Sequence, residues 1–166
     1  MKLDTIILGS ALLTLAACAE EAPDLPYGPP QMLMAGEVEP YAQTYWQAVR
    51  FESRLMPDGT VKETDFRPET DAEWEEVRAA AAHLREMAEV LESPAYSDGR
   101  GEAWLTYAGG LGDAALAAEQ AAQAKDADAV FTAGGTLYNV CRACHQMYPP
   151  AELEQEGATV DDVAQG

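Results

Sequence analysis

Basic residues are scarce in this sequence. Its 166 residues include ten lysines and arginines against 29 aspartates and glutamates, which gives a formal net charge of −19. Affinity for nucleic acids comes mainly from lysine and arginine contacts with phosphates. The composition therefore excludes nucleic acid as a partner.

Aromatic residues are also few, at 8% of the chain, whereas alanine is abundant. This composition favours helices over a β-sandwich or barrel. The chain is 48% hydrophobic and 23% charged, so it can bury a core and does not have the composition of a disordered acidic chain. We expect one helical domain.

Only three cysteines are present, and Cys18 stands apart from the other two. It follows Lys2 and an apolar run that is too short to span a membrane, which predicts a signal peptide over residues 1–17. The run ends in Leu15-Ala16-Ala17-Cys18, which resembles the lipobox of bacterial lipoproteins. That resemblance implies a lipidated Cys18 and anchorage to a membrane in the periplasm of a Gram-negative bacterium, with a plain signal peptide as the alternative.

The remaining chain divides into three parts. Residues 18–31 contain four prolines and are expected to form a tether, residues 32–150 a domain, and residues 151–166 an acidic tail. Within the domain, apolar residues recur at helical spacing in four stretches. We expect an all-α, antiparallel up-and-down bundle of four helices. The expected helices span 30–56 or 40–56, 71–92, 102–125 and 127–148.

The core positions follow from this spacing. On the second helix they are Trp74, Val77, Ala81, Leu84, Ala88 and Leu91, and on the third Trp104, Leu105, Leu111 and Leu116. Two glycine pairs, Gly109-Gly110 and Gly134-Gly135, interrupt the third and fourth helices, where glycine is unfavourable. They indicate either a tight helix crossing or a flat prosthetic group lying against the helices.

The remaining two cysteines belong to the motif Cys141-Arg142-Ala143-Cys144-His145. On a helix, residues at i, i+3 and i+4 point to the same side. Two thiols and an imidazole in this arrangement suit thioether bonds to a haem, with His145 as the iron ligand. The motif predicts one covalent haem c, bound through Cys141 and Cys144 near the end of the last helix.

Three other interpretations of the motif compete with haem. A redox-active pair would open a helix, where a thiol pKa falls, whereas this motif lies near a helix end. Zinc would need a fourth ligand, and the only other histidine is His83. A structural disulfide would leave His145 without a role.

With its motif at the end of the last of four helices, the chain resembles the class II cytochrome c family, which includes cytochromes c′ and c556. The resemblance covers roughly residues 32–148 and is strongest over 134–145 and at Tyr148, with support from Trp104 and Asp126. Where several members of the family carry a basic residue after the motif, this chain has Pro149-Pro150. That difference shortens the last helix and exposes more of the haem edge.

The resemblance implies that the first helix faces the second axial position of the iron. Met34 shares a helical face with Val38, Tyr41 and Tyr45, so it is the candidate ligand, and Met32 competes only if this segment is extended. An ordinary core methionine is the alternative for Met34. Tyr41, Tyr45, Trp46, Trp104 and Tyr138 are candidates for a haem pocket or the core, and Arg50 and Arg142 for pairing with haem propionates.

Together these features predict a membrane-tethered monohaem cytochrome that carries single electrons and is not an enzyme. The acidic surface then implies redox partners with a basic docking patch. A protein with an open iron that binds NO or CO, and a structural lipoprotein without haem, are the alternatives. A homodimer is left open.

Overall fold

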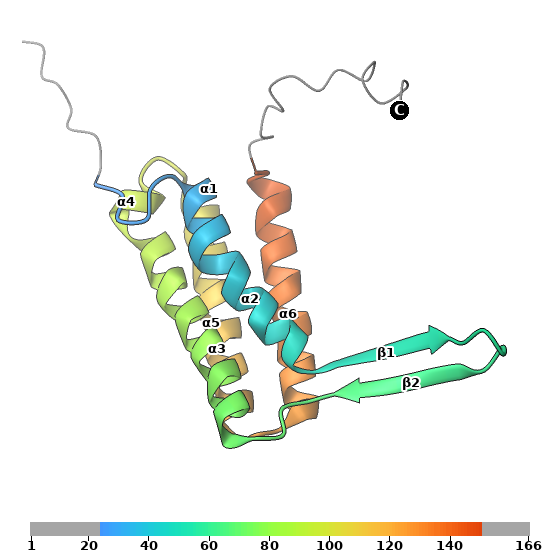
Figure 1. The fold of residues 1–166 in the computed structure, drawn as a ribbon. Helices are drawn as coiled ribbons and strands as arrows, with labels where there is room; N and C mark the ends of the chain where they lie inside the picture. The colour runs from blue at the N-terminus through green and yellow to red at the C-terminus, as the bar shows by residue number, and fades with distance from the viewer. Residues whose placement is uncertain (1–23, 151–166) are drawn as a thin grey trace, which may run out of the picture.

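The computed structural model describes residues 24–150, which form a mostly helical fold with one small sheet (Figure 1). The prediction of a helical protein is confirmed in this coarse form. The predicted signal peptide with Cys18 and the acidic tail lie outside the described residues. The helices are α1 (Pro30–Leu33), the π-helical turn η1 (Met34–Val38), α2 (Glu39–Ala48), α3 (Asp71–Glu92), α4 (Pro94–Ser97), α5 (Glu102–Gln123) and α6 (Ala127–Met147).

The first helical stretch begins at Pro30 and is interrupted by η1 just before Pro40. Proline has no backbone N–H and its ring crowds the preceding turn. The chain responds by widening that turn: the N–H of Glu39 donates to the carbonyl of Met34, five residues earlier. The two alternatives for the start of this helix are thus both partly realised, since the helix starts at Pro30 and is distorted before Pro40.

The prediction that this helix continues to Met56 is wrong. Helix α2 ends at Ala48, and the chain then forms an antiparallel hairpin of strands β1 (Arg50–Leu55) and β2 (Val61–Phe66). From Arg50 to Leu55 every second residue is charged, and uncharged residues lie between them, with a period of two rather than 3.6. The turn around Pro57-Asp58-Gly59, expected to end a helix, joins the two strands instead.

The starts of the next long helices agree with their predicted caps. The hydroxyl of Thr70 accepts the N–H of Glu73, whose carboxylate in turn accepts the N–H of Thr70. Asp126 accepts the N–H of Ala129 at the start of α6. These contacts satisfy backbone donors that a helix start leaves free.

The core lies between α3, α5 and the helices that cover them. All six predicted core residues of α3 are buried, as are Val130 and Leu137 of α6. On α5 the prediction is half wrong, because Trp104 and Leu111 are buried whereas Leu105 and Leu116 are exposed. Alanines occupy most of the buried face of α5, which lets α3 and α5 approach closely.

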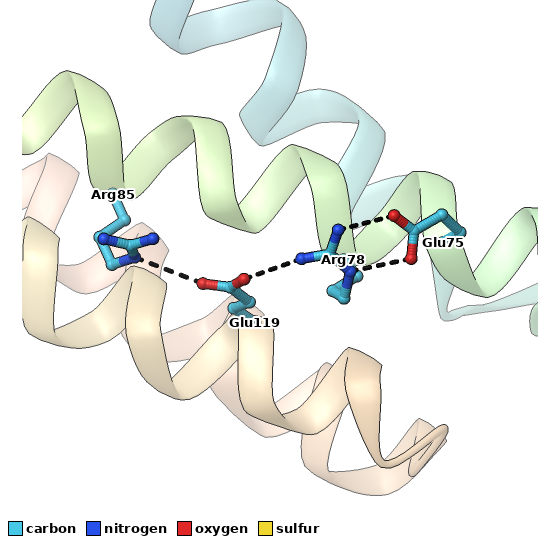
Figure 2. A network of polar contacts seen from close by, with 4 residues as sticks. All are labelled: Glu75, Arg78, Arg85 and Glu119. Carbon is cyan, nitrogen blue, oxygen red and sulfur yellow. Dashed lines mark hydrogen bonds and ion pairs between the residues drawn. The ribbon is translucent and has the colours of Figure 1, made fainter.

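An ion network ties α3 to α5 on their outer side (Figure 2). The half-buried carboxylate of Glu119 accepts from Arg78 at 2.9 Å and from Arg85 at 3.3 Å, and Arg78 also pairs with Glu75 at 2.6 Å. One carboxylate thus holds two arginines that lie two turns apart on the neighbouring helix. Networks of this kind contribute more than isolated surface pairs.

We expect Glu119→Gln to lower the free energy of unfolding by about 1 kcal/mol at low salt, because it leaves two guanidinium groups without their shared partner. Urea unfolding at low and high salt would measure this. The matched control is Glu89→Gln, which removes an exposed partner of Arg85 at 3.4 Å and should cost less than about 0.5 kcal/mol. Equal losses in the two variants would contradict a special role for Glu119.

The segment before α1 contacts the helices. Leu25 packs against the core, the N–H of Tyr27 donates to the Tyr96 hydroxyl at 3.2 Å, and that hydroxyl donates to the Gly28 carbonyl at 2.8 Å. The final part of the predicted tether is therefore attached to the fold at α4. Within residues 24–150, no helix has both the length and the apolar character needed to cross a membrane.

Candidate functional site: an apolar cavity beside the cysteine motif

The Cys141–His145 motif occupies the last turns of α6, as predicted. The helix continues to Met147 and is followed by Tyr148, whose N–H donates to the Cys144 carbonyl at 2.8 Å. Cys141 and Cys144 are partly buried and not joined to each other, whereas His145 is exposed. Thiols and imidazole thus lie on one side of a regular helix.

This side of α6 faces a small apolar cavity of about 60 Å³. Its walls come from η1, α3, α5 and α6, which lie far apart in the sequence. All three chemical groups of the motif line it, and so does Met34 from η1. The remaining lining residues are Val38, Leu91, Trp104, Tyr107, Ala108, Leu111 and Val140.

The structure distinguishes the two candidate methionines. Met34 is partly buried, packs against the core and lines the cavity. Met32 is 65% exposed and does not line it. The segment is helical here, so residues two apart point in different directions.

Burial raises the pKa of both motif thiols, and at Cys141 the neighbouring Cys144 raises it further. Both are therefore protonated at neutral pH in the unmodified chain. Reactive thiols of redox enzymes have lowered pKa values, commonly at a helix start. The position at a helix end and the direction of the shift both argue against a redox-active pair.

Zinc receives no support either. Within residues 24–150, no three side chains of His, Cys, Asp or Glu converge as a metal-binding cluster would require. His83 is occupied elsewhere: its Nε2 lies 3.0 Å from Glu37 and its ring stacks on Tyr41 with centroids 3.7 Å apart.

The groups lining the cavity fit a covalently bound haem. Two thiols and an imidazole lie on one helix, a thioether lies on another, and the lining between them is apolar. The cavity alone is smaller than typical cofactor sites of about 300–1,000 Å³. A porphyrin would therefore have to extend beyond this cavity.

Aromatic side chains pack against one another beside the part of the cavity that α5 lines. Trp104 donates from Nε1 to the Leu91 carbonyl at 2.7 Å and meets the edge of Tyr148 at a centroid distance of 5.1 Å. The Tyr148 hydroxyl donates to the Arg100 carbonyl at 2.9 Å, and the Arg100 guanidinium lies 4.5 Å from the Trp104 ring. This cluster connects the end of α6 to the start of α5.

Of the five aromatic candidates for a pocket, only Trp104 lines this cavity. Tyr45 is buried in the core, where its hydroxyl donates to the Ala118 carbonyl at 3.2 Å. Trp46 donates to the Gly134 carbonyl at 2.9 Å and lies edge-on to Tyr138.

The sequence reasoning missed Tyr107 and Arg100. Tyr107 lies one helical turn after Trp104, so the spacing of α5 contained the signal for it. Neither Arg50 nor Arg142, the two candidates for pairing with haem propionates, lines the cavity. Arg50 stacks on Phe66 in the hairpin, and Arg142 is exposed on α6.

The glycine pairs have different surroundings. A Cβ on Gly134 would approach Trp46 Cδ1 to 3.2 Å, so this glycine admits the indole of α2. A Cβ on Gly110 would meet Val140 at 3.8 Å, an ordinary contact, and one on Gly135 would meet nothing within 4 Å. At Gly134, then, close helix packing explains the residue without a prosthetic group.

Comparison of the chain with models of known protein families, with curated proteins and with solved structures finds no match.

Proposed function

We propose that this protein is a monohaem c-type cytochrome of the class II type, an antiparallel four-helix bundle that carries single electrons. The observation that supports the proposal most is the composition of one cavity. Cys141, Cys144 and His145 meet Met34 there, although more than 100 residues separate Met34 from the motif. No part of the motif itself requires a methionine at that place.

Each residue then has a distinct role. The thiols of Cys141 and Cys144 would hold the porphyrin through thioether bonds, and His145 and Met34 would bind the iron. The haem supplies the one-electron chemistry when it is bound. The apolar walls from η1, α3 and α5 exclude water from it, which helps to set its potential.

Electron transfer is favoured over gas binding because Met34 lines the cavity. A methionine ligand gives a low-spin iron with a raised potential, whereas an iron without a second ligand is open to CO or NO. The acidic surface then suits redox partners with basic docking patches, whose association would weaken as salt increases. Export and a lipid on Cys18 would hold the protein at a membrane of the periplasm.

The direct test is to produce the full chain in a bacterium that attaches haem c and to denature the product. We expect the denatured protein to keep one haem, seen as an increase in intact mass and as haem stain on a denaturing gel. Cys141→Ala/Cys144→Ala should lose it, and Cys18→Ala, the matched control, should keep it. A wild-type chain without haem, in a host that loads a reference cytochrome, would overturn the proposal and favour a structural lipoprotein.

A further inference from the structure

The hairpin of β1 and β2 has no role in the proposed haem site. It projects sideways from the helices (Figure 1). The ring of Phe51 on β1 meets the edge of Phe131 on α6 at a centroid distance of 5.7 Å. Because an isolated two-stranded hairpin is only marginally stable in water, such a hairpin is normally covered by a further strand or by a helix.

One face of the hairpin carries apolar side chains that remain in solvent. Phe51, Leu55 and Val61 are 63%, 74% and 61% exposed. The segment 50–67 also contains four basic and four acidic residues, whereas the rest of the chain carries the whole net charge of −19. The hairpin is therefore a neutral surface through which two copies of this acidic protein can approach without strong repulsion.

Strand β1 has a free edge in the two-stranded sheet that residues 24–150 form. The N–H of Met56 donates to Thr60 at 2.8 Å, across the hairpin. Since hydrogen-bonding direction alternates along an antiparallel strand, the backbone groups of Ser53 and of residues 51 and 55 point to the free edge. Those three residues are the ones that another strand would meet.

The sequence of β1 is complementary to itself about Ser53. If a second copy pairs antiparallel with a two-fold axis at Ser53, Phe51 faces Leu55 of that copy, and Glu52 faces its Arg54. An axis at Glu52 or Arg54 would set identical charges opposite each other. In β2, a two-fold axis at any residue from 62 to 65 would likewise set charges of the same sign opposite each other.

Charge within the hairpin supports the same register. In one copy Arg54 lies directly opposite Lys62, and among the described residues neither has an ion-pair partner. Like charges opposite each other destabilise a sheet. Glu52 of a second copy, which pairs with Arg50 at 3.2 Å within its own chain, would also lie opposite Arg54 and supply a carboxylate there.

The same register would also place part of the second copy over a groove. An apolar groove of about 500 Å³ lies between the base of β1 and α6, with Trp46, Phe51, Phe131 and Tyr138 in its walls. Pairing about Ser53 sets Met56 of the second copy level with Arg50, and its Pro57 level with Val49. Both Arg50 and Val49 line the groove, so the second copy's turn would lie over it.

We infer that two copies of this chain form a two-fold dimer by pairing their β1 strands about Ser53, which joins the hairpins into one four-stranded sheet. The inference is independent of the haem. The occupant of the exposed hairpin face is thus a second copy of this protein.

Sedimentation velocity of the purified full chain tests the dimer by a charge exchange. Wild-type protein should sediment as a dimer, Glu52→Arg and Arg54→Glu should each be monomeric at the same concentration, and the double variant should be dimeric again. Glu63→Arg makes the same change of charge on β2 and should leave the dimer intact. A monomeric wild type, or a double variant that stays monomeric with unchanged circular dichroism, would overturn the inference.

A cysteine variant tests the register itself. Directly opposed, hydrogen-bonded residues have Cα atoms about 5.5 Å apart, which suits a disulfide. In the Cys18→Ala background, Ser53→Cys should therefore form a linked dimer on mild oxidation, and Thr64→Cys on β2 should not. Equal linkage of both variants, or none at position 53, would contradict pairing about Ser53.

Discussion

Met34→Ala is expected to convert the proposed low-spin cytochrome into a protein whose reduced iron is open and binds CO rapidly. Met34 is the one methionine that lines the cavity facing Cys141, Cys144 and His145. Removing its thioether leaves no sulfur ligand there, so the iron should become high-spin and its reduction potential should fall. Absorption spectra of oxidised and reduced protein, with and without CO, measure both changes.

Met32→Ala is the matched control for this prediction. It removes the same side chain from a neighbouring position that is exposed and lies outside the cavity. Its spectrum and CO reactivity should equal those of the wild type. Rapid CO binding by the unmodified protein would show that Met34 is not a ligand and would favour the gas-binding alternative.

Leu84→Ala should lower the free energy of unfolding by about 2 to 5 kcal/mol. Leu84 is 1% exposed in the middle of α3, the helix that packs most extensively against α5. The substitution removes buried methyl groups and leaves a cavity that the close-packed helices can fill only partly. Urea unfolding followed by circular dichroism gives the change, with the slope m showing whether the unfolded surface is altered.

The same substitution at an exposed leucine separates burial from residue type. Leu105 on α5 is 45% exposed, so Leu105→Ala should change stability by less than about 0.5 kcal/mol. A loss at Leu105 as large as that at Leu84 would mean that Leu105 is covered by something other than the described residues.

The long helices were predictable because several local signals agreed. The cap at Thr70 with Glu73, the proline after Ser93 and the cap at Asp126 all fall where the helices begin or end. The core face of α3 was correct for the same reason, since its large apolar residues recur with one period. On α5 small residues dominate, so periodicity could not tell the buried face from the exposed one, and Leu105 and Leu116 were misplaced.

The hairpin was missed because its signal is short and its alternation combines charged with apolar residues. Val49 and Met56 continue the helical spacing of Val38, Tyr41 and Tyr45, so a helix extended from α2 explained this segment equally well. The deciding feature was the turn Pro57-Asp58-Gly59 between two alternating segments, which is typical of a β-hairpin.

Half of the candidate site could be predicted. The spacing of Cys141, Cys144 and His145 is a local property of one helix, so it predicted that these three side chains lie on the same side. The wall opposite depends on how the distorted turn before Pro40 orients Met34 and on which residues of α5 face α6. Those are properties of packing between distant segments, and Arg100 was not found for that reason, whereas the spacing of Tyr107 after Trp104 could have indicated it.

The hydrogen bonds of Tyr96 to residues 27 and 28 also limit how far the domain can move from a membrane. If Cys18 carries a lipid, only residues 18–25 connect the lipid to the fold. A chain of that length spans at most about 25 Å. This attachment lies at the end of the fold where α6 also finishes, whereas the hairpin lies at the other end (Figure 1). The end with the Cys141–His145 motif would therefore stay close to the lipid surface, where a membrane-bound electron donor could reach the proposed haem, and the hairpin would lie farther from the membrane.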